Sequence, residues 1–404
     1  MLGAGAIIAS GVGPAPRGPG AILTLGPIRH VGRISYSWYL WHWPPLVFVA
    51  AWLGHSLKPW QGFAVVAVTW IPAYLSWRFL EEPFRRSEVL VQKPHRAYGL
   101  ALVLTAVGTV AGLLLVAGAS HATTVARDPQ GLLVKVDPAA ARKDLPIAYS
   151  DGCRAEYRRT TALICHYADT KSPNKVTLFG DSHALQWQPA FVDIAKKNRW
   201  ALDLAVKTGC SPTDVQVWDL VKKRAYTECS KWRDSTVDTL IAGPNKPDVV
   251  VISQRDSYRI ATSHGPMSKA ASDPIVQAGL ERTYNKLTAA GIKVVVLGNE
   301  PEPGRDIPDC LSTFTKNPSR CNFPRRLSYN RTAPDRGAAA AAGLVFVDPS
   351  NVVCPQRTCS VINRRTVVYR DENHLTASFV RAIEPALRRL FTAAGVAALG
   401  TRVP

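Results

Sequence analysis

Three residues with side chains suited to nucleophilic catalysis lie in two segments far apart in the sequence. Ser182 follows an apolar run in VTLFGDSHA, residues 176–184, and Asp371 and His374 lie in DENHLTA, residues 371–377. A serine hydroxyl is a poor nucleophile until a nearby imidazole accepts its proton, and a carboxylate fixes the tautomer of that imidazole. We therefore expect Ser182 to be a nucleophile, His374 its base and Asp371 the residue that orients His374.

The apolar run before Ser182 predicts a buried strand that ends in a sharp turn into a helix. Sequence separation is no obstacle to a joint site, because the ends of different parallel strands converge at the carboxyl edge of a sheet. The structural alternative is that Asp181 and Ser182 only cap a helix and that DENH is a solvated loop. Either segment alone is a weak signal, but the two together favour catalysis.

Length and charge set the broad class. The chain has 404 residues, of which 47% are hydrophobic, so it can bury a sizeable core in two or three domains. Lys and Arg number 49 against 30 Asp and Glu, for a formal net charge of +19. The basic residues are scattered, and much of the excess flanks apolar segments. This pattern favours membrane lipids or an acidic envelope over nucleic acid as the partner.

The region 1–119 has the composition of membrane-spanning sequence. Residues 99–119 carry no charge and are long enough to cross a bilayer as a helix. Residues 34–54 are uncharged apart from His42 and are rich in Trp and Tyr, and residues 59–80 form a third candidate that Pro72 weakens. We therefore predict about three transmembrane helices in a multi-pass protein of the cell membrane, the alternative being buried helices of a soluble domain.

Basic residues next to these segments predict the orientation. They precede the first span and lie between the second and third, at Arg29, His30, Arg33, Arg78, Arg85, Arg86, Lys93 and Arg96. By the positive-inside rule these stretches face the cytoplasm, so the chain after residue 119 is outside. Residues 1–28 lack the features of a secretory signal and are interpreted as the remnant of an earlier span. His42 is interpreted as an interfacial packing residue rather than as a lining of an acyl pathway.

Cysteine usage indicates an oxidising compartment. The eight cysteines all follow residue 150, at positions 153, 165, 210, 229, 310, 321, 354 and 359. An even number confined to one side of the predicted membrane is typical of disulfides. We predict pairing between nearest neighbours, which is one of many possible connectivities. The sequence has no C-x-x-C pair, so we predict no zinc site and no other metal.

The remainder divides into a linker and a folded domain. Residues 120–150 contain Pro129, Pro138 and Pro146 with little periodicity, which predicts a linker. In residues 151–404, buried strands are predicted at 176–180, 201–206, 248–253, 293–298 and 344–348. Helices are predicted at 183–199, 229–242, 275–290, 325–342 and 375–394. This alternation predicts a three-layer α/β domain with a mainly parallel sheet.

These motifs carry a family resemblance. GDSHA at 180–184 followed by DENHLT at 371–376 resembles the SGNH (GDSL-like) hydrolase superfamily. RISYSWYLWHWPPL at 33–46 and FLEEPFRRS at 79–87 resemble the closing membrane helices of the acyltransferase-3 family. Their order resembles the bacterial fused acyltransferase-3/SGNH proteins, which O-acylate cell-envelope polysaccharides.

The resemblance implies a division of labour. The membrane part would move an acyl group, usually acetyl from cytoplasmic acetyl-CoA, and the exterior domain would pass it through Ser182 to a sugar hydroxyl of a polysaccharide or glycolipid. No cofactor is expected to be bound. The backbone N–H groups of Ser182 and of Gly209 in KTGC are candidate oxyanion donors, although Gly209 is as readily a plain turn glycine. His183 is interpreted as a local hydrogen-bonding residue rather than a second base.

The chain departs from the family pattern in two places. SGNH enzymes usually have Gly-x-Asn-Asp after the third strand, where this chain has residues 253–256, Ser-Gln-Arg-Asp. Arg255 is a possible cationic replacement for the asparagine donor, and a surface salt bridge is the alternative. In addition, no segment before residue 29 is able to hold the early acyltransferase-3 helices. We therefore expect a fragment, a misplaced start or a separate acyltransferase-3 partner.

The sequence leaves three functions open. A membrane-tethered serine O-acyltransferase acting on an envelope glycan is the first. The second is an exported esterase, in which water rather than a sugar hydroxyl resolves the same acyl-serine. The third is a glycan-binding or scaffolding module on an inactive hydrolase fold, which the presence of Ser182, Asp371 and His374 disfavours.

Overall fold

The computed structural model divides the chain into two compact units, Met1–Ser120 and His121–Pro404. The structure describes residues 25–53, 57–119, 124–127, 133–328, 333–396 and 399. Most of the segment interpreted as the remnant of an earlier span, residues 1–28, lies outside the described residues.

The described part of the first unit is helical. Its elements are α3 (Gly26–Leu53), α4 (Pro59–Val68), α5 (Trp70–Ser76), the π-helical turn η1 (Trp77–Glu81), α6 (Glu82–Arg85), α7 (Glu88–Gln92) and α8 (Pro94–Ala119). The long apolar side chains of α8 are exposed, as with Leu115 at 75%. An exposed apolar surface of this length suits contact with lipid.

Among the described residues, two helical stretches are long and apolar enough to cross a bilayer, Pro59–Arg85 and Pro94–Gly118. They include nearly all of the predicted spans at 59–80 and 99–119. The remaining predicted span, 34–54, lies almost wholly in α3. Its mean hydropathy is lower than that of the other two, because Trp, Tyr, His and Pro residues replace aliphatic ones. The prediction of about three membrane helices is therefore only partly shown.

Polar contacts join α3 to the helices that follow it. The Ser37 hydroxyl donates to Glu81 Oε2 at 2.7 Å, and the Trp38 indole N–H donates to the Thr69 hydroxyl at 3.0 Å. Hydrogen bonds of this kind stabilise helix pairs where water is scarce.

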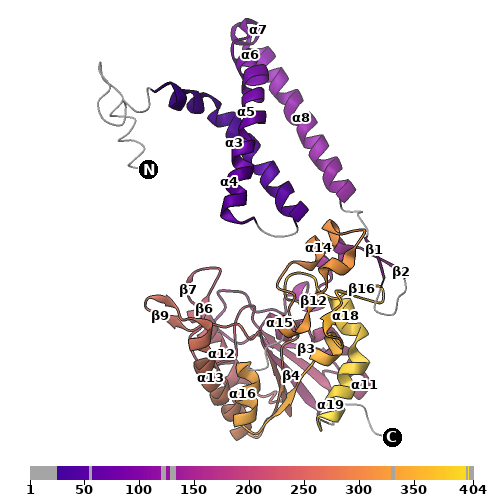
Figure 1. Ribbon diagram of the computed structural model, residues 1–404. Coiled ribbons are helices and arrows are strands. Elements are labelled where there is room, and N and C mark those ends of the chain that lie inside the picture. The colour runs from indigo at the N-terminus through magenta and orange to yellow at the C-terminus, as the bar shows by residue number, and fades with distance from the viewer. Residues whose placement is uncertain are drawn as a thin grey trace. The chain divides into compact units, whose positions relative to one another are not determined.

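A six-stranded sheet forms the centre of the second unit (Figure 1). Its spatial order is β13-β11-β8-β4-β5-β3, and every neighbouring pair is parallel except β3 with β5. The strands are β3 (Cys165–Ala168), β4 (Lys175–Gly180), β5 (Ala201–Val206), β8 (Val249–Ser253), β11 (Lys293–Leu297) and β13 (Val345–Val347). The five predicted strands agree with the last five of these within one residue at either end. They are buried on both faces, which is why they read as continuous apolar runs.

Helices cover both faces of this sheet, so the predicted three-layer architecture is confirmed (Figure 1). One face carries α11 (Gln188–Asn198), α18 (Ala377–Ala382) and α19 (Glu384–Ala393), and the other carries α12 (Thr227–Ala242), α13 (Lys269–Ala289) and α16 (Pro334–Ala341). Successive strand residues point to opposite faces. Leu178 therefore packs in the first core and Phe179 in the second.

Short elements connect these layers. The helical ones are α9 (Pro138–Lys143), η2 (Ile147–Tyr149), α10 (Ser182–Leu185), α14 (Ile307–Thr313), η3 (Pro318–Cys321), α15 (Arg325–Ser328) and α17 (Ser350–Val353). The strands are β1 (Thr124–Arg127), β2 (Leu133–Val136), β6 (Trp218–Asp219), β7 (Arg224–Ala225), β9 (Ala261–Thr262), β10 (Gly265–Pro266), β12 (Phe323–Pro324), β14 (Thr358–Cys359), β15 (Ile362–Asn363) and β16 (Thr366–Val367).

The structure differs from the prediction in several local places. The predicted helix at 183–199 is two helices, α10 and α11, because Pro189 favours a new helix start. The predicted helix at 325–342 likewise includes α15 and α16, and the second begins at Pro334. The predicted linker at 120–150 packs as part of the second unit over residues 133–149. Alternation in β2 buries Val134 and Val136 in the first core.

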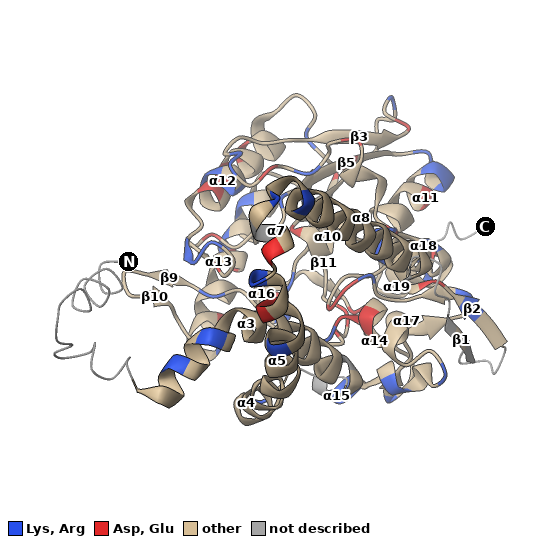
Figure 2. Cartoon of the chain, turned by 90° about the horizontal axis from the view of Figure 1, so that it is seen from above, with Lys and Arg blue, Asp and Glu red and all other residues tan. Residues whose placement is uncertain are grey.

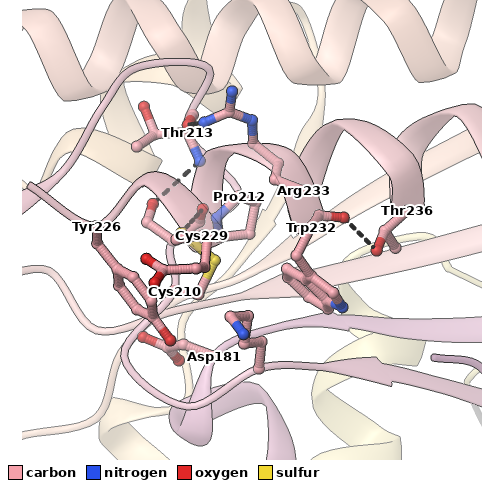
Figure 3. The surroundings of a disulfide bond; sticks show 12 residues. Asp181, Cys210, Pro212, Thr213, Tyr226, Cys229, Trp232, Arg233 and Thr236 are labelled. Carbon is pink, nitrogen blue, oxygen red and sulfur yellow. Dashed lines mark hydrogen bonds between the residues drawn. A yellow bond between two sulfur atoms is a disulfide. The ribbon is translucent and has the colours of Figure 1, made fainter. Parts of the chain in front are cut away.

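Four disulfides join the eight cysteines in the predicted nearest-neighbour pairs. The pairs are Cys153–Cys165, Cys210–Cys229, Cys310–Cys321 and Cys354–Cys359. The second of them ties the turn after β5 to the first turn of α12, where Tyr226 and Trp232 pack close by (Figure 3).

Charged residues are spread over the second unit. Lys and Arg occur on several of its elements, among them α11 and α12 (Figure 2). This distribution agrees with the scattered basic residues of the sequence.

Candidate active site

Ser182 lies at the point where β4 turns sharply into α10. Gly180, the last residue of β4, has φ +154°, and a Cβ added there would lie 1.9 Å from the carbonyl oxygen of Ser253 on β8. Only glycine fits this close passage of two strands. The next residue, Asp181, begins the helix, and its Oδ1 accepts from the backbone N–H of His183 at 2.7 Å. The turn therefore holds Ser182 at the carboxyl edge of the sheet.

Asp181 is itself fixed by the neighbouring strand. Its Oδ2 accepts from the backbone N–H of Arg255 at 2.9 Å and from the Tyr258 hydroxyl at 2.6 Å. β4 and β8 are adjacent although β5 lies between them in sequence, so they flank the point where the strand order reverses. Ligand sites of doubly wound sheets lie at this point.

Asp371 and His374 lie in the loop between β16 and α18. Asp371 Oδ1 accepts from the backbone N–H groups of Asn373 and His374 at 2.9 and 2.7 Å, which closes the loop on itself. Asp371 Oδ2 and His374 Nδ1 are 2.8 Å apart, and His374 Nε2 lies 2.8 Å from Ser182 Oγ. The structure thus brings the three predicted residues together in one hydrogen-bonded chain, which we call the relay.

Electrostatics favour a neutral imidazole beside an ionised carboxylate. Burial alone would raise the pKa of Asp371, but hydrogen bonds from His374 and its positive charge hold that pKa below its usual range. Burial lowers the pKa of His374, and the hydrogen bond to Asp371 opposes this only in part. Near neutral pH, His374 can therefore carry its hydrogen on Nδ1 and accept the Ser182 proton on Nε2.

The relay opens onto a pocket of about 430 Å³. Ser182 is 7% exposed, which leaves its hydroxyl sheltered but accessible from this pocket. The pocket is also lined by the turn after β5, the β6–β7 hairpin, the segment after β8, and single residues before β3 and after β7. Four aromatic residues contribute to this lining, Tyr157, Trp218, Tyr226 and Tyr258.

Gly209 lies on this pocket in the turn after β5. Its φ of +66° is in the left-handed region, which favours glycine. In the described part of the chain, the backbone N–H groups of Ser182 and Gly209 have no hydrogen-bond acceptor. Both groups therefore remain candidate oxyanion donors.

Arg255 lines the same pocket, but its guanidinium is already paired. It donates to Glu302 through Nε at 3.0 Å and through Nη2 at 2.6 Å. The structure therefore shows Arg255 in a salt bridge, which was the alternative role considered for it in the sequence analysis. Its side chain nevertheless lines the pocket. Arg255 also contributes its backbone N–H to Asp181, a role that the sequence did not indicate.

Two polar partners of His183, Asn299 and Glu300, were missed from the sequence. His183 is fully buried, and its Nδ1 lies 2.7 Å from Asn299 Oδ1 and 3.3 Å from Glu300 Oε1. Asn299 and Glu300 follow β11 in the sequence GNEPEP. Polar residues directly after a predicted strand were the available signal, because that position lies at the same edge of the sheet as Ser182.

Within the described residues, no group of three or more His, Cys, Asp or Glu side chains is arranged to hold a metal ion.

The geometry defines a class of protein, a doubly wound α/β domain with a serine–histidine–aspartate relay at its switch point. Residues 152–389 match the family model of the SGNH domain that is fused to AT3 domains. Because this match covers more than half of the chain, the chain belongs to that family.

Two curated relatives align with a short part of the chain. The O-acetyltransferase OatA of Staphylococcus aureus (strain NCTC 8325 / PS 47) is 35% identical over 65 residues. The peptidoglycan O-acetyltransferase OatA of Listeria monocytogenes serovar 1/2a (strain ATCC BAA-679 / EGD-e) is 38% identical over 68 residues. Each alignment covers 16% of this chain and 11% of the relative, so the chain matches only about a tenth of the relatives' length.

Solved structures also align with the chain, among them an acetyltransferase domain. The periplasmic domain of a lipopolysaccharide acetyltransferase from Salmonella ser. Paratyphi A gives a TM-score of 0.41 at 15% identity, over 61% of this chain and 86% of that domain.

Proposed function

We propose that the chain is a membrane-tethered O-acyltransferase that passes an acyl group, most simply acetyl, through an acyl-serine to a hydroxyl of a cell-envelope polysaccharide or glycolipid. The observation that carries this proposal is the relay from Asp371 through His374 to Ser182, open to a pocket of about 430 Å³. Membership of the SGNH family that is fused to AT3 domains supports it. The two relatives described above, which are O-acetyltransferases, also support it.

In the first step the Ser182 oxygen attacks the carbonyl carbon of the acyl donor, and its proton passes to His374 Nε2. The carbonyl oxygen becomes an oxyanion, which the N–H groups of Ser182 and Gly209 would stabilise. As the tetrahedral intermediate collapses, the donor's leaving oxygen takes the proton from His374. Ser182 then carries the acyl group as an ester.

In the second step a sugar hydroxyl attacks this ester. His374 accepts the hydroxyl proton, and the new tetrahedral intermediate collapses to an acylated sugar. The Ser182 oxygen leaves and recovers its hydrogen from His374. Water in place of the sugar hydroxyl gives hydrolysis by the same atoms, so acceptor binding decides between transfer and the esterase alternative.

The aromatic wall of the pocket suits a sugar acceptor. Tyr157 and Tyr226 stack with ring centroids 4.6 Å apart, and Trp218 extends the wall along the β6–β7 hairpin. Aromatic rings offer apolar faces for the C–H faces of sugar rings, while their polar edges reach hydroxyl groups. We place the acceptor in this part of the pocket, next to Ser182.

In this proposal, the membrane unit takes part in delivering the acyl group to Ser182. Acetyl-CoA would act indirectly, through acyltransferase-3 helices that load the acyl group, in this chain or in a separate partner. The catalytic unit would then lie outside the cytoplasm in a multi-pass protein. The four disulfides of that unit and the basic residues flanking the apolar helices support this orientation.

Ester turnover by the full chain in detergent tests the function. The purified protein is incubated with a chromogenic acetyl ester, with and without an oligosaccharide acceptor, and the products are identified by mass spectrometry. We expect acetylated sugar and an acetyl group on Ser182. Release of acetate alone at every acceptor concentration would favour the esterase.

Two variants assign the activity to the relay. Ser182→Ala should lower kcat/KM by at least about 10³-fold, because the nucleophile is lost. Ser263→Ala, at an exposed serine outside the pocket, is the matched control and should retain full activity. Equal activity of the Ser182→Ala variant and the parent would remove the proposed nucleophile.

The orientation has its own test. Alkaline phosphatase fused after Pro404 is active only outside the cytoplasm, so the fusion should be active in intact cells. An inactive fusion that is present at normal levels would place the catalytic unit inside.

A further inference from the structure

His183 lies directly against the base of the relay. Its side chain is fully buried, and its ring centroid is 4.7 Å from that of His374, with the two ring planes tilted by 38°. In the steps proposed above, His183 neither attacks nor transfers a proton. A buried titratable group in contact with a catalytic imidazole can still act through its charge.

A buried polar network holds the Nδ1 side of His183 in place, whereas Nε2 is buried without a hydrogen-bond partner among the described residues. Its Nδ1 lies 2.7 Å from Asn299 Oδ1 and 3.3 Å from Glu300 Oε1. The Gln186 amide nitrogen is 2.9 Å from both carboxyl oxygens of Glu300. The Gln186 carbonyl oxygen accepts from the backbone N–H of Leu375 at 2.8 Å, next to His374. The network therefore connects α10 and the end of β11 to the loop that carries the base.

The charges around His183 favour its protonated form. The carboxylates that act on His183 are Asp181 before α10 and Glu300 and Glu302 after β11, and its ring also lies against that of His374. Arg255, after β8, is a cation that interacts with Asp181 and is already paired with Glu302. Glu300 is 2% exposed, and a buried carboxylate is costly without a cationic partner.

The geometry points to a neighbouring cation for Glu300. Donation by the Gln186 amide to both oxygens of Glu300 suits an ionised carboxylate, which is an acceptor at both positions. Burial lowers the pKa of His183, but the hydrogen bond and the charge of Glu300 outweigh this and raise the pKa to about 9.

We propose that His183 is a positioning residue, an imidazolium that is buried against Glu300 and that keeps the adjacent His374 imidazole neutral and correctly oriented for its role as base. This inference rests on the proposed function only for the role of His374. The other groups that face His374 are Asp371, which favours its protonation, and Arg370, which opposes it. The positive charge of His183 adds to the effect of Arg370.

The proposal predicts the direction of a shift in the pH profile. Activity needs neutral His374, so kcat/KM rises as the pH passes the pKa of His374. His183→Gln removes a positive charge, which raises that pKa. The acid limb of the profile should therefore move to higher pH by about 1–2 units, the usual effect of a charge at this distance.

Glu300→Gln gives a sharper test. The acid limb of the pH profile should move in one direction if His183 is charged, and in the other direction or not at all if His183 is neutral. Without Glu300, His183 loses the partner that keeps it charged, so the acid limb should again move to higher pH. If His183 were already neutral, removing a carboxylate would move the limb to lower pH or leave it in place. His166→Gln, at a histidine–aspartate pair that joins β3 to β5 outside the pocket, is the matched control and should leave the profile unchanged.

An NMR titration of the parent protein tests the charge of His183 directly. It requires neither a folded variant nor enzyme turnover. The full chain in detergent is labelled with ¹⁵N in its histidine rings, and the His183 signal is assigned by comparison with His183→Gln or, if that variant is unstable, by its through-space contact with His374. We expect the His183 ring to stay protonated through pH 7, while His374 is neutral there. A neutral His183 ring at pH 6, or acid limbs that move in opposite directions in the two variants, overturns the proposal. A protonated His183 in a protein without ester turnover overturns the proposed function alone.

Discussion

Ser182 Oγ lies 2.8 Å from His374 Nε2, although 192 positions separate the two residues in the sequence. The strand order explains this approach, because Ser182 directly follows β4 at the switch point and the DENHLT loop closes over the same edge. Two contacts anchor that loop to the sheet. Gln186 accepts from the backbone of Leu375, and the Tyr369 hydroxyl donates to the carbonyl of Pro301 at 2.7 Å. The relay therefore depends on anchors outside its own three residues.

Replacing Asp371 by asparagine tests the orienting role. The amide can present an N–H to His374, which favours the wrong tautomer, so kcat should fall by about 10²–10⁴-fold with little change in KM. Steady-state kinetics with the acetyl ester measure this. Asp273→Asn, which breaks a surface ion pair with Lys269, is the matched control and should keep normal kinetics. Similar kinetics for both variants would contradict the assignment.

Asp371 should also contribute to stability in a pH-dependent way. Its pKa in the folded state lies below the usual value of 3.8, so the folded state favours the ionised form. Its contribution is therefore present above about pH 4 and is lost as the pH falls below that value. Thermal unfolding of the parent and of Asp371→Asn should show a gap in Tm at pH 6 that narrows toward pH 3. A gap that widens in acid would contradict the depressed pKa.

Much of this fold could be predicted from the sequence because its strands are buried on both faces. A continuous apolar run such as 249–252 indicates a central parallel strand, because both faces of such a strand are buried. β3 was missed because an edge strand of four residues, CHYA, has no apolar run. Residues 133–149 were read as a linker because two prolines in that range broke the periodicity, and the burial of Val134 becomes visible only once the second unit is folded.

The three relay residues could be predicted from short sequence motifs, whereas the residues around them could not. Ser182, Asp371 and His374 lie in short motifs, where local spacing fixes the turn and the Asp–His hydrogen bond. The pairing of His183 with Glu300 has no such local signature, since the partners come from α10 and the segment after β11. Their charge states depend on burial and on neighbours from three further segments, which tertiary structure alone brings together.

The Cys210–Cys229 disulfide should support both stability and the oxyanion turn. It closes a loop of 19 residues next to Gly209, and replacing both cysteines by serine should lower the free energy of unfolding by about 3 kcal/mol. Denaturant unfolding measures this, and kcat should fall as the turn loosens. The double serine variant of Cys354–Cys359, whose loop spans 5 residues and whose cysteines lie outside the pocket, is the matched control. It should lose about 2 kcal/mol with kcat unchanged. If both variants lost kcat to the same extent, the Cys210–Cys229 disulfide would have no specific role in the oxyanion turn.

Gly209→Ala separates the oxyanion donor from a plain turn glycine. Alanine at a φ of +66° is strained by about 1–2 kcal/mol, and relief of that strain should move the backbone N–H away from the pocket. We expect kcat for the acetyl ester to fall by about 10-fold or more, because oxyanion donors act only at short range. Gly152→Ala is the matched control, since Gly152 has a φ of +74°, has open space at the added methyl and lies outside the pocket. It should show a similar loss of Tm and an unchanged kcat. If both variants lose Tm and neither loses kcat, Gly209 serves only the turn, and the second oxyanion donor must come from another part of the pocket wall.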